Sequence, residues 1–207
     1  MSSQTVAGLP LQTERLSIRD FNENDSESLF QLYKLPETSR YESWSIVGDE
    51  AEATEILQYW IKEQNVDPRK SYTLAVELKD SATFIGLIGL DRGFSVETDS
   101  SRIGSVGFRY FPEQWNRGYA TEALCAILSW GFESLGLQRI HSGCVVENAA
   151  SARVLEKAGM RREGTTRQSF PIDNVWYDYH IYGILRADPH PYPGPSLRVT
   201  EIVRSRP

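Results

Sequence analysis

The sequence predicts a mixed α/β fold, with a mostly antiparallel sheet of about six to seven strands flanked by about four helices. The middle of the chain is rich in short segments whose apolar residues alternate or form a continuous run, as strands do. After Gly118 the apolar positions take the spacing of one helix face. The turn Lys79-Asp80-Ser81 indicates a hairpin, whereas the two later helices imply crossovers, so helices are expected on both faces of the sheet.

The expected elements follow in the order strand, helices, three strands, helix, strand, helix, strand. The expected strands cover residues 11–20, 72–78, 83–90, 103–111, 139–146 and 176–185. The expected helices cover residues 29–33, 52–64, 119–135 and 151–158. Leu16 and Ile18 alternate with polar neighbours in the first strand, whereas the apolar run TFIGLIGL over 83–90 indicates a strand buried on both faces. Proline or glycine stands at several expected element ends, at Pro36, Pro112, Gly136 and Gly159.

Length and composition indicate one domain with a tail. The chain has 207 residues, of which 40% are hydrophobic and 24% charged, a balance that excludes wholesale disorder. We expect an N-terminal extension over 1–10, a domain over 11–186 and an extended proline-rich tail over 187–207. The net charge of −6 argues against nucleic acid as the main partner.

The cysteine content and the apolar segments bound the compartment. Cys125 and Cys144 are too few for a disulfide framework or a zinc cluster, so we expect no metal and a reducing compartment. Met1–Pro10 has no apolar targeting segment, and the longest apolar stretch is too short to span a bilayer. We therefore expect a soluble, cytoplasmic protein without a membrane partner, and the sequence leaves a homodimer open.

The most informative segment leads from a strand through a glycine-containing turn into a long helix, and reads FPEQWNRGYATEA over 111–123. Free N–H groups and the helix dipole favour an anion at a helix N-terminus. Gly118 and Ala120 let a phosphate approach the backbone, Arg117 adds a positive charge, and Thr121 offers a hydroxyl. Alternatively, Gly118 merely starts the helix. The segment is neither a Walker loop nor a Rossmann fingerprint.

A second segment, ENAASARVLEKAGM over 147–160, ends one strand and opens a helix about 30 residues after the first segment. With forms WxxGYATEA and NxxSxxVLEKxG, the two segments resemble the GNAT superfamily of acyl-CoA-dependent N-acyltransferases. They resemble its RimJ/RimL branch, which includes ribosomal-protein-alanine N-acetyltransferases. An opening LxTERLxIRxF and Trp176-Tyr177-Asp178 with Tyr182 also match, so the resemblance extends over residues 11–185.

The resemblance implies acetyl-CoA as the acyl donor. It also implies a GNAT-type sheet with a V-shaped opening between the fourth and fifth expected strands, in which the pantetheine arm of CoA lies like an added strand. Phe108 and Tyr110 would offer their backbone to the pantetheine amides. Asn148 would contact the cofactor near its thioester end, and Ser151 would lie close to the sulfur. The residues that would cradle the pyrophosphate are Trp115, Asn116, Arg117, Gly118, Tyr119, Ala120 and Thr121.

Both proton-transfer roles lack the residues that the family commonly uses. Many members place a tyrosine acid at the position of Leu155, and the branch often has a glutamate base at the position of Ser105. Ser151 is therefore the candidate acid for the leaving thiolate, and departure of the thiolate without an acid is the alternative. Asp178 is the first candidate base and Glu77 the second, although a carboxylate such as Asp178 commonly serves a local hydrogen bond instead.

Other histidine, cysteine and aromatic residues are more often structural than catalytic. His141 and His180 are weaker candidate bases, because an imidazole has a near-neutral pKa. Cys125 and Cys144 are expected to pack in the core, with Cys144 a weaker candidate nucleophile. Three aromatic residues are candidates for the wall of the acceptor pocket or for the core, namely Tyr41, Trp44 and Trp60.

We expect direct transfer in a ternary complex to a primary amine, either a protein N-terminus or a small amine or amino-acid-like metabolite. The missing glutamate and tyrosine leave room for a diverged acceptor, including an alcohol. The loops expected to contact the acceptor, over 37–50, 92–101 and 162–175, carry no readable code. A catalytically lapsed CoA-binding module is the alternative, because residues 105 and 155 are not the usual glutamate and tyrosine and because a matching fold does not guarantee a matching function. A nucleotide-binding domain unrelated to CoA is the third hypothesis.

Overall fold

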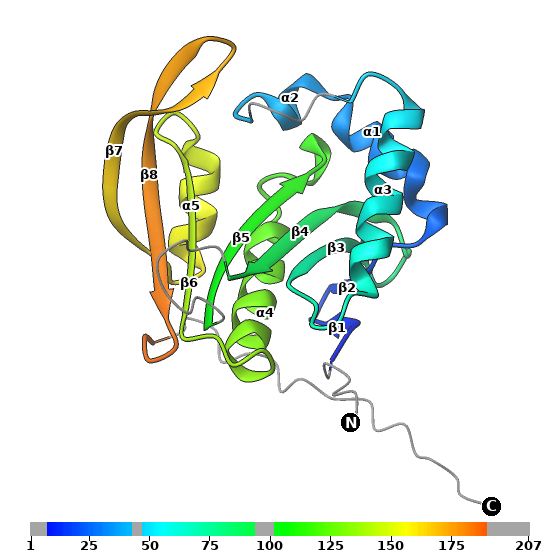
Figure 1. Ribbon diagram of the computed structural model, residues 1–207, viewed down its shortest axis with the longest axis horizontal. Helices are drawn as coiled ribbons and strands as arrows, with labels where there is room; N and C mark the ends of the chain where they lie inside the picture. The colour runs from blue at the N-terminus through cyan, green and yellow to red at the C-terminus, as the bar shows by residue number, and fades with distance from the viewer. Residues whose placement is uncertain (1–7, 43–46, 94–101, 190–207) are drawn as a thin grey trace, which may run out of the picture.

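The computed structural model describes residues 8–42, 47–93 and 102–189. Within these ranges, eight strands form one sheet in the order β1-β2-β3-β4-β5-β6-β8-β7 (Figure 1). Neighbouring strands are antiparallel, except that β5 and β6 run parallel. The strands are β1 (Leu11–Gln12), β2 (Leu16–Asp20), β3 (Ser71–Leu78), β4 (Phe84–Arg92), β5 (Ile103–Tyr110), β6 (Arg139–Val145), β7 (Arg161–Ile172) and β8 (Val175–Leu185). Most of the expected N-terminal extension and tail lies outside the described residues.

Helices cover both faces of the sheet, as predicted. The α-helices of the described ranges are α1 (Ser26–Tyr33), α2 (Pro36–Ser39), α3 (Glu50–Gln64), α4 (Tyr119–Glu133) and α5 (Ala149–Lys157). The short 3-10 helices η1 (Glu23–Asp25) and η3 (Pro112–Gln114) precede α1 and α4. Buried residues of α4 and α5 belong to one core cluster, and those of α1 and α3 belong to a second cluster on the other face (Figure 1).

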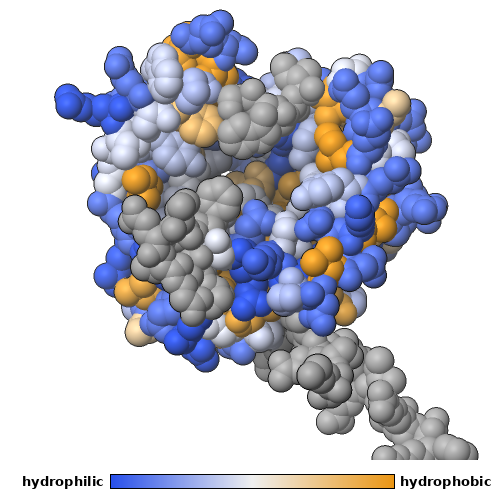
Figure 2. Space-filling view, viewed as in Figure 1, coloured by the Kyte–Doolittle hydropathy of each residue, from blue (hydrophilic) through white to orange (hydrophobic). Residues whose placement is uncertain are grey.

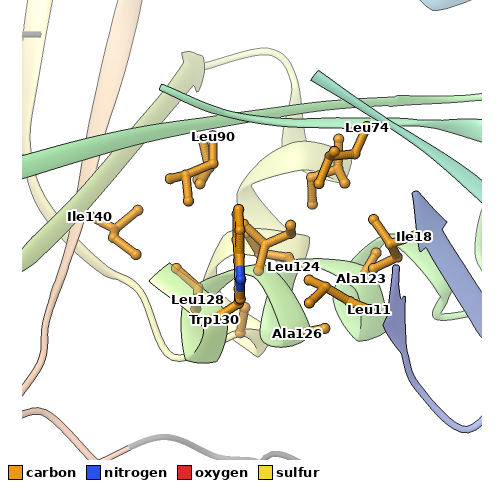
Figure 3. Close-up of a cluster of buried hydrophobic side chains, with 14 of the residues drawn as sticks. Leu11, Ile18, Leu74, Leu90, Ala123, Leu124, Ala126, Leu128, Trp130 and Ile140 are labelled. Atoms are coloured by element: carbon orange, nitrogen blue, oxygen red, sulfur yellow. The ribbon is translucent and has the colours of Figure 1, made fainter. Parts of the chain in front are cut away.

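The larger core lies under α4, whose apolar residues recur with helical spacing as predicted. Trp130 is fully buried, and its ring meets that of Tyr72 edge-on at 4.9 Å. Figure 3 shows Leu124 and Trp130 of α4 among side chains from the sheet, including Leu90 and Ile140. Because α4 begins directly after the turn that follows β5, this packing fixes the position of that turn.

The smaller core lies under α1 and α3. Phe21 packs there with Leu29 and Leu57, and the ring of Trp60 lies 5.2 Å from that of Phe21. Trp60, which the sequence left open between pocket wall and core, therefore packs against this core. Trp44, another of the aromatic candidates, lies outside the described residues.

The sheet has eight strands rather than six to seven, and the added strand corrects a prediction. Most of 162–175, expected to be a loop, lies in β7 and pairs with β8. Because β7 is an edge strand with shifts in its register, nearly all of its side chains are exposed and no apolar alternation marks it. The first expected strand is also divided in two by a turn, where the Thr13 N–H donates to the Leu16 carbonyl at 3.0 Å. The helix α2 overlaps the start of 37–50, which the sequence left open between a loop and a broken helix.

Candidate functional site

The sheet opens between β5 and β6, where the fourth and fifth expected strands were predicted to diverge. The two strands pair over three rungs only, Ile103 with Arg139, Gly104 with Ile140 and Ser105 with His141. One further contact follows, in which the Ser142 hydroxyl donates to the Val106 carbonyl at 2.8 Å. Residues 107–110 then pair with β4 on one edge and with no described strand on the other. Phe108 and Tyr110 lie on this free edge, which an extended ligand backbone could join.

The turn from β5 to α4 is held by backbone conformations that favour glycine and asparagine. Asn116 and Gly118 have φ angles of 58° and 83°, in the left-handed region. The Trp115 indole N–H donates to the Tyr110 carbonyl at 2.8 Å. Since α4 begins directly after Gly118, its first N–H groups have no partner within the helix. Residues 115–118 are exposed, so the predicted cradle is a continuous and accessible turn.

The N-terminal strands brace this turn through contacts that the sequence analysis missed. Arg15, between β1 and β2, donates through Nε to Glu122 at 2.7 Å and through Nη1 to the Arg117 carbonyl at 3.1 Å. Its guanidinium also lies 4.5 Å from the centroid of the Tyr119 ring, and Thr13 donates to Glu122 at 2.6 Å. The segments LxTERL and GYATEA, quoted separately from the sequence, therefore meet in space.

The charges around the turn suit an anion. Arg117 is exposed, the Arg15 side chain is 44% exposed, and the N-terminus of α4 adds the positive end of its dipole. Burial alone would raise the pKa of Glu122, but its hydrogen bonds from Thr13 and Arg15 hold that pKa below the ordinary value. The Glu122 carboxylate is therefore charged and already bonded. The turn itself presents N–H and guanidinium groups, a donor set that fits a diphosphate.

We expect Glu122→Gln to lower the free energy of unfolding by about 1.5–3 kcal/mol, the range for hydrogen bonds to charged groups, and to weaken anion binding at the turn. Because the folded-state pKa is lowered, this stabilisation is present above the ordinary glutamate pKa and is lost as the pH falls through the folded-state value. Thermal unfolding from about pH 3 to 7 measures the difference. Glu133→Gln, at the exposed end of the same helix, is the control. Equal stability of the two variants over this range would contradict the brace.

The N-terminus of α5 brings Asn148 and Ser151 to the α4 side of the sheet. Asn148 is the N-cap, and its Oδ1 accepts the Ser151 N–H at 3.1 Å. Among the described residues the Ser151 hydroxyl makes no hydrogen bond, so it is available to a ligand. Leu155, at the position where many relatives of the resembled family carry a tyrosine, is fully buried in the larger core. No acid can act from that position.

The face that carries α1 and α3 is hollowed beside the opening (Figure 2). Gly107 is exposed, and no described residue lies within 4 Å of the point that a Cβ there would occupy. The buried guanidinium of Arg109 pairs with Glu42, and the neighbouring Tyr41 hydroxyl donates to the Glu147 carbonyl at 3.3 Å. The chain after α2 therefore extends to the end of β6. Tyr41 contacts that end, as expected of a residue in the wall of the acceptor pocket.

Asp178, the first candidate base, lies near the end of β6. Its backbone carbonyl accepts the Val146 N–H at 3.0 Å. Its carboxylate accepts the Gln168 N–H at 2.9 Å, beside a hollow of 720 Å³ in the β7–β8 hairpin. This local hydrogen bond is the structural role that was the alternative to catalysis for Asp178.

The remaining sequence candidates lie apart from the turn. Glu77 pairs with Arg19 at the far side of the sheet, and the His180 Nδ1 lies 2.8 Å from the Thr165 hydroxyl. Burial raises the pKa of the Cys144 thiol to about 11, which keeps it protonated near neutrality and disfavours a nucleophilic role.

Two absences among the described residues concern membranes and metals. No helix among them has the length and apolar character to cross a membrane. No group of three or more histidine, cysteine or acidic side chains gathers there as metal ligands would.

Comparison with known proteins gives a consistent result. The family described as "Acetyltransferase (GNAT) domain" matches residues 15–161. The uncharacterized N-acetyltransferase YoaA of Bacillus subtilis is 29% identical over 176 residues, which cover 85% of this chain and 96% of that protein. A GNAT-family acetyltransferase structure from Bacillus anthracis has a TM-score of 0.74 and 30% identity, with coverage of 85% and 98%. Mycobacterium smegmatis RimJ in complex with CoA-disulfide shares the fold, with a TM-score of 0.73, 19% identity and coverage of 86% and 89%.

Proposed function

The chain belongs to the GNAT acetyltransferase family, and on that premise we propose that it transfers an acetyl group from acetyl-CoA to a primary amine in a ternary complex. The observation that carries the proposal is the free edge of β5, which leads directly into the anion-binding turn before α4. A donor with an extended amide-containing arm and a diphosphate matches this order of sites.

The residues that would hold the donor are those predicted from the sequence. Phe108 and Tyr110 would pair through their backbone with the pantetheine arm, and the diphosphate would lie on the turn over 115–121. The donor supplies a thioester, whose acyl carbon is open to attack by a neutral amine. Asn148 keeps the N-terminus of α5 in place, and Ser151 is proposed to give a proton to the departing sulfur. Asp178 remains the candidate base from the sequence.

The acceptor that the site suits best is an α-amine or a similarly weak amine. The position of the branch glutamate is Ser105, so no carboxylate stands there to remove a proton. At neutral pH an α-amine with a pKa of about 7.7–8.0 is partly neutral, whereas only about one lysine ε-amine in a few thousand is neutral. We therefore expect a peptide with a free N-terminus and a blocked lysine to react faster than one with a blocked N-terminus and a free lysine.

Release of free thiol from acetyl-CoA, followed from about pH 6 to 9 with both peptides, measures this preference and tests the function itself. A peptide blocked at both amines is the control for hydrolysis. Faster acetylation of the lysine peptide across the range would reject the α-amine preference. Thiol release that no amine accelerates, with a wider panel of small amines included, would reject amine acetylation.

Finer assignments are part of the same proposal. We place the chain in the RimJ/RimL-like branch because the quoted motifs resemble that branch, and the RimJ structure shares its fold. A cytoplasmic location fits the free thiols of Cys125 and Cys144. The catalytically lapsed alternative, which Ser105 and Leu155 suggested, gains no support from the family match or from the named relatives.

A further inference from the structure

The two faces of the sheet at the opening serve different partners. The N-termini of α4 and α5 lie on one face, so a donor held by the turn, with its sulfur near Ser151, occupies that side. An amine that attacks the acyl carbon must approach from a side the donor does not fill. The face of α1 and α3, which is hollowed (Figure 2) and on which Gly107 is exposed, provides that approach.

His141 faces this approach. Ile140 and Cys144 of β6 point into the core under α4 and α5, so the alternation of the strand places His141 and Gly143 on the opposite face. The register sets His141 directly beside Ser105, in the last rung before β5 and β6 part. The imidazole of His141 is therefore the cross-strand neighbour of Ser105, the position at which the branch often has a glutamate.

The next rung leaves space in front of this imidazole. Gly107 follows Ser105 on the same face of β5, and Gly89 of β4 is its partner. Among the described residues, a Cβ at Gly107 would meet nothing within 4 Å, and one at Gly89 would meet only backbone oxygens at 3.9 Å. His141 is half-buried at the end of this space where β5 and β6 still pair. An amine or a water molecule above Gly107 and Gly89 would lie between the imidazole and the free edge of β5.

We propose that His141 takes the proton of the acceptor amine, directly or through one water, in place of the missing carboxylate. The inference rests on the proposed acetyl transfer. The amine nitrogen forms the bond to the acyl carbon, and its N–H proton passes to a ring nitrogen of His141. The carbon–sulfur bond breaks with its electrons on sulfur, Ser151 is the candidate donor of the sulfur's proton, and solvent returns a proton to the Ser151 hydroxyl. The imidazolium then returns its proton to solvent.

The surroundings of His141 keep it available as a base. Burial and the positive charge of Arg139 lower its pKa below the ordinary value, while Glu163 acts in the opposite direction. Two charged side chains of β7 are already paired, Glu163 with Arg139 and Arg161 with Asp188 at 3.6 Å. The neutral imidazole therefore predominates at neutral pH. A base this weak suits an α-amine better than a lysine, which agrees with the proposed acceptor.

The carboxylates nearby are less well placed. Asp91 of β4 also neighbours Ser105, but it lies one strand further from the opening and accepts the Ser71 hydroxyl at 2.5 Å. Asp178 shares a face of β8 with Tyr182, which is buried under α5, so Asp178 lies on the donor side. Of His141, Asp91 and Asp178, His141 is the one that lies on the acceptor face at the edge of the opening.

The test compares His141→Gln with the wild type and with Asp91→Asn as the matched control. We measure kcat/KM for the peptide with a free N-terminus from about pH 5 to 9, together with CoA affinity and thermal stability. Protonation of the α-amine, with a pKa of about 7.7–8.0, gives every variant a first fall on the acid side. The wild-type profile should steepen again below the ordinary histidine pKa, and this second fall is the acid limb assigned to His141. His141→Gln should lose about a hundredfold in kcat/KM at neutral pH, lose that acid limb and keep its CoA affinity. Asp91→Asn should keep the limb.

A second variant separates catalysis from folding. His141→Ala should regain activity with added imidazole, which cannot restore a merely structural side chain. Unchanged kcat/KM and an unchanged acid limb in His141→Gln, or the absence of imidazole rescue, would overturn the proposal while wild-type transfer stands. Loss of the limb in Asp91→Asn instead would assign the base to Asp91. A wild-type protein that acetylates no amine would reject both the proposed function and this inference.

Discussion

Gly118→Val is expected to reduce CoA affinity by at least about tenfold, which corresponds to about 1.4 kcal/mol. Valine is disfavoured at a φ angle of 83°, and a left-handed backbone costs a residue with a side chain about 1–2 kcal/mol. A Cβ at this position would point toward Nη2 of Arg15 at 3.4 Å, so the larger branched side chain also disturbs the brace. The turn can relieve this strain only by moving the N–H groups that are proposed to bind the diphosphate. Calorimetric titration with CoA measures the loss.

Gly136→Val provides the matched control, because it creates similar backbone strain at the other end of α4. Gly136 has a φ angle of 68°, and nothing lies within 4 Å of its Cβ position. We expect this variant to lower the melting temperature while the folded protein keeps its CoA affinity. Equal affinities for Gly118→Val and the wild type, in folded samples, would reject the assignment of the cradle.

Ser151→Ala is expected to lower kcat by about a hundredfold, the lower part of the range for general acid catalysis, and to leave CoA affinity nearly unchanged. The fold should persist, because Asn148 accepts the backbone N–H of residue 151 rather than its hydroxyl. Steady-state rates at saturating acetyl-CoA, combined with a binding titration, separate the two effects.

Ser151→Thr is the control that keeps a hydroxyl at the same position and should retain more activity than Ser151→Ala. An unchanged kcat in Ser151→Ala would show that the thiolate leaves without an acid or that another group supplies the proton. Leu155 could not be that group, because its side chain is apolar and buried in the core.

The sequence was most informative where local chemistry decides the structure. The helical spacing of apolar residues after Gly118 predicted α4, and the face so predicted carries the buried Trp130. The small residue before that helix predicted the turn, because a left-handed backbone and an exposed helix N-terminus favour glycine. The opening beside the turn followed from the family resemblance rather than from the spacing of residues.

Features that depend on long-range pairing could not be read in the same way. The edge strand β7 is polar on both faces, so nothing in its pattern distinguishes it from a loop. The brace joins Arg15 to Glu122 across 107 residues of sequence. The place of His141 beside Ser105 depends on the parallel register of β5 and β6, which α4 and its loops determine. The sequence contains each of these residues but does not indicate which residues lie next to them in the fold.

Amide hydrogen exchange with and without CoA tests most directly whether the donor occupies the opening and the turn. In the free protein, residues 107–110 have a strand partner on one edge only, and the first N–H groups of α4 have no helical partner. CoA should therefore slow exchange over 107–110 and over 117–121, while exchange in the edge strand β7 remains unchanged. Saturating CoA that binds but leaves both segments at their free rates would contradict this placement of the donor.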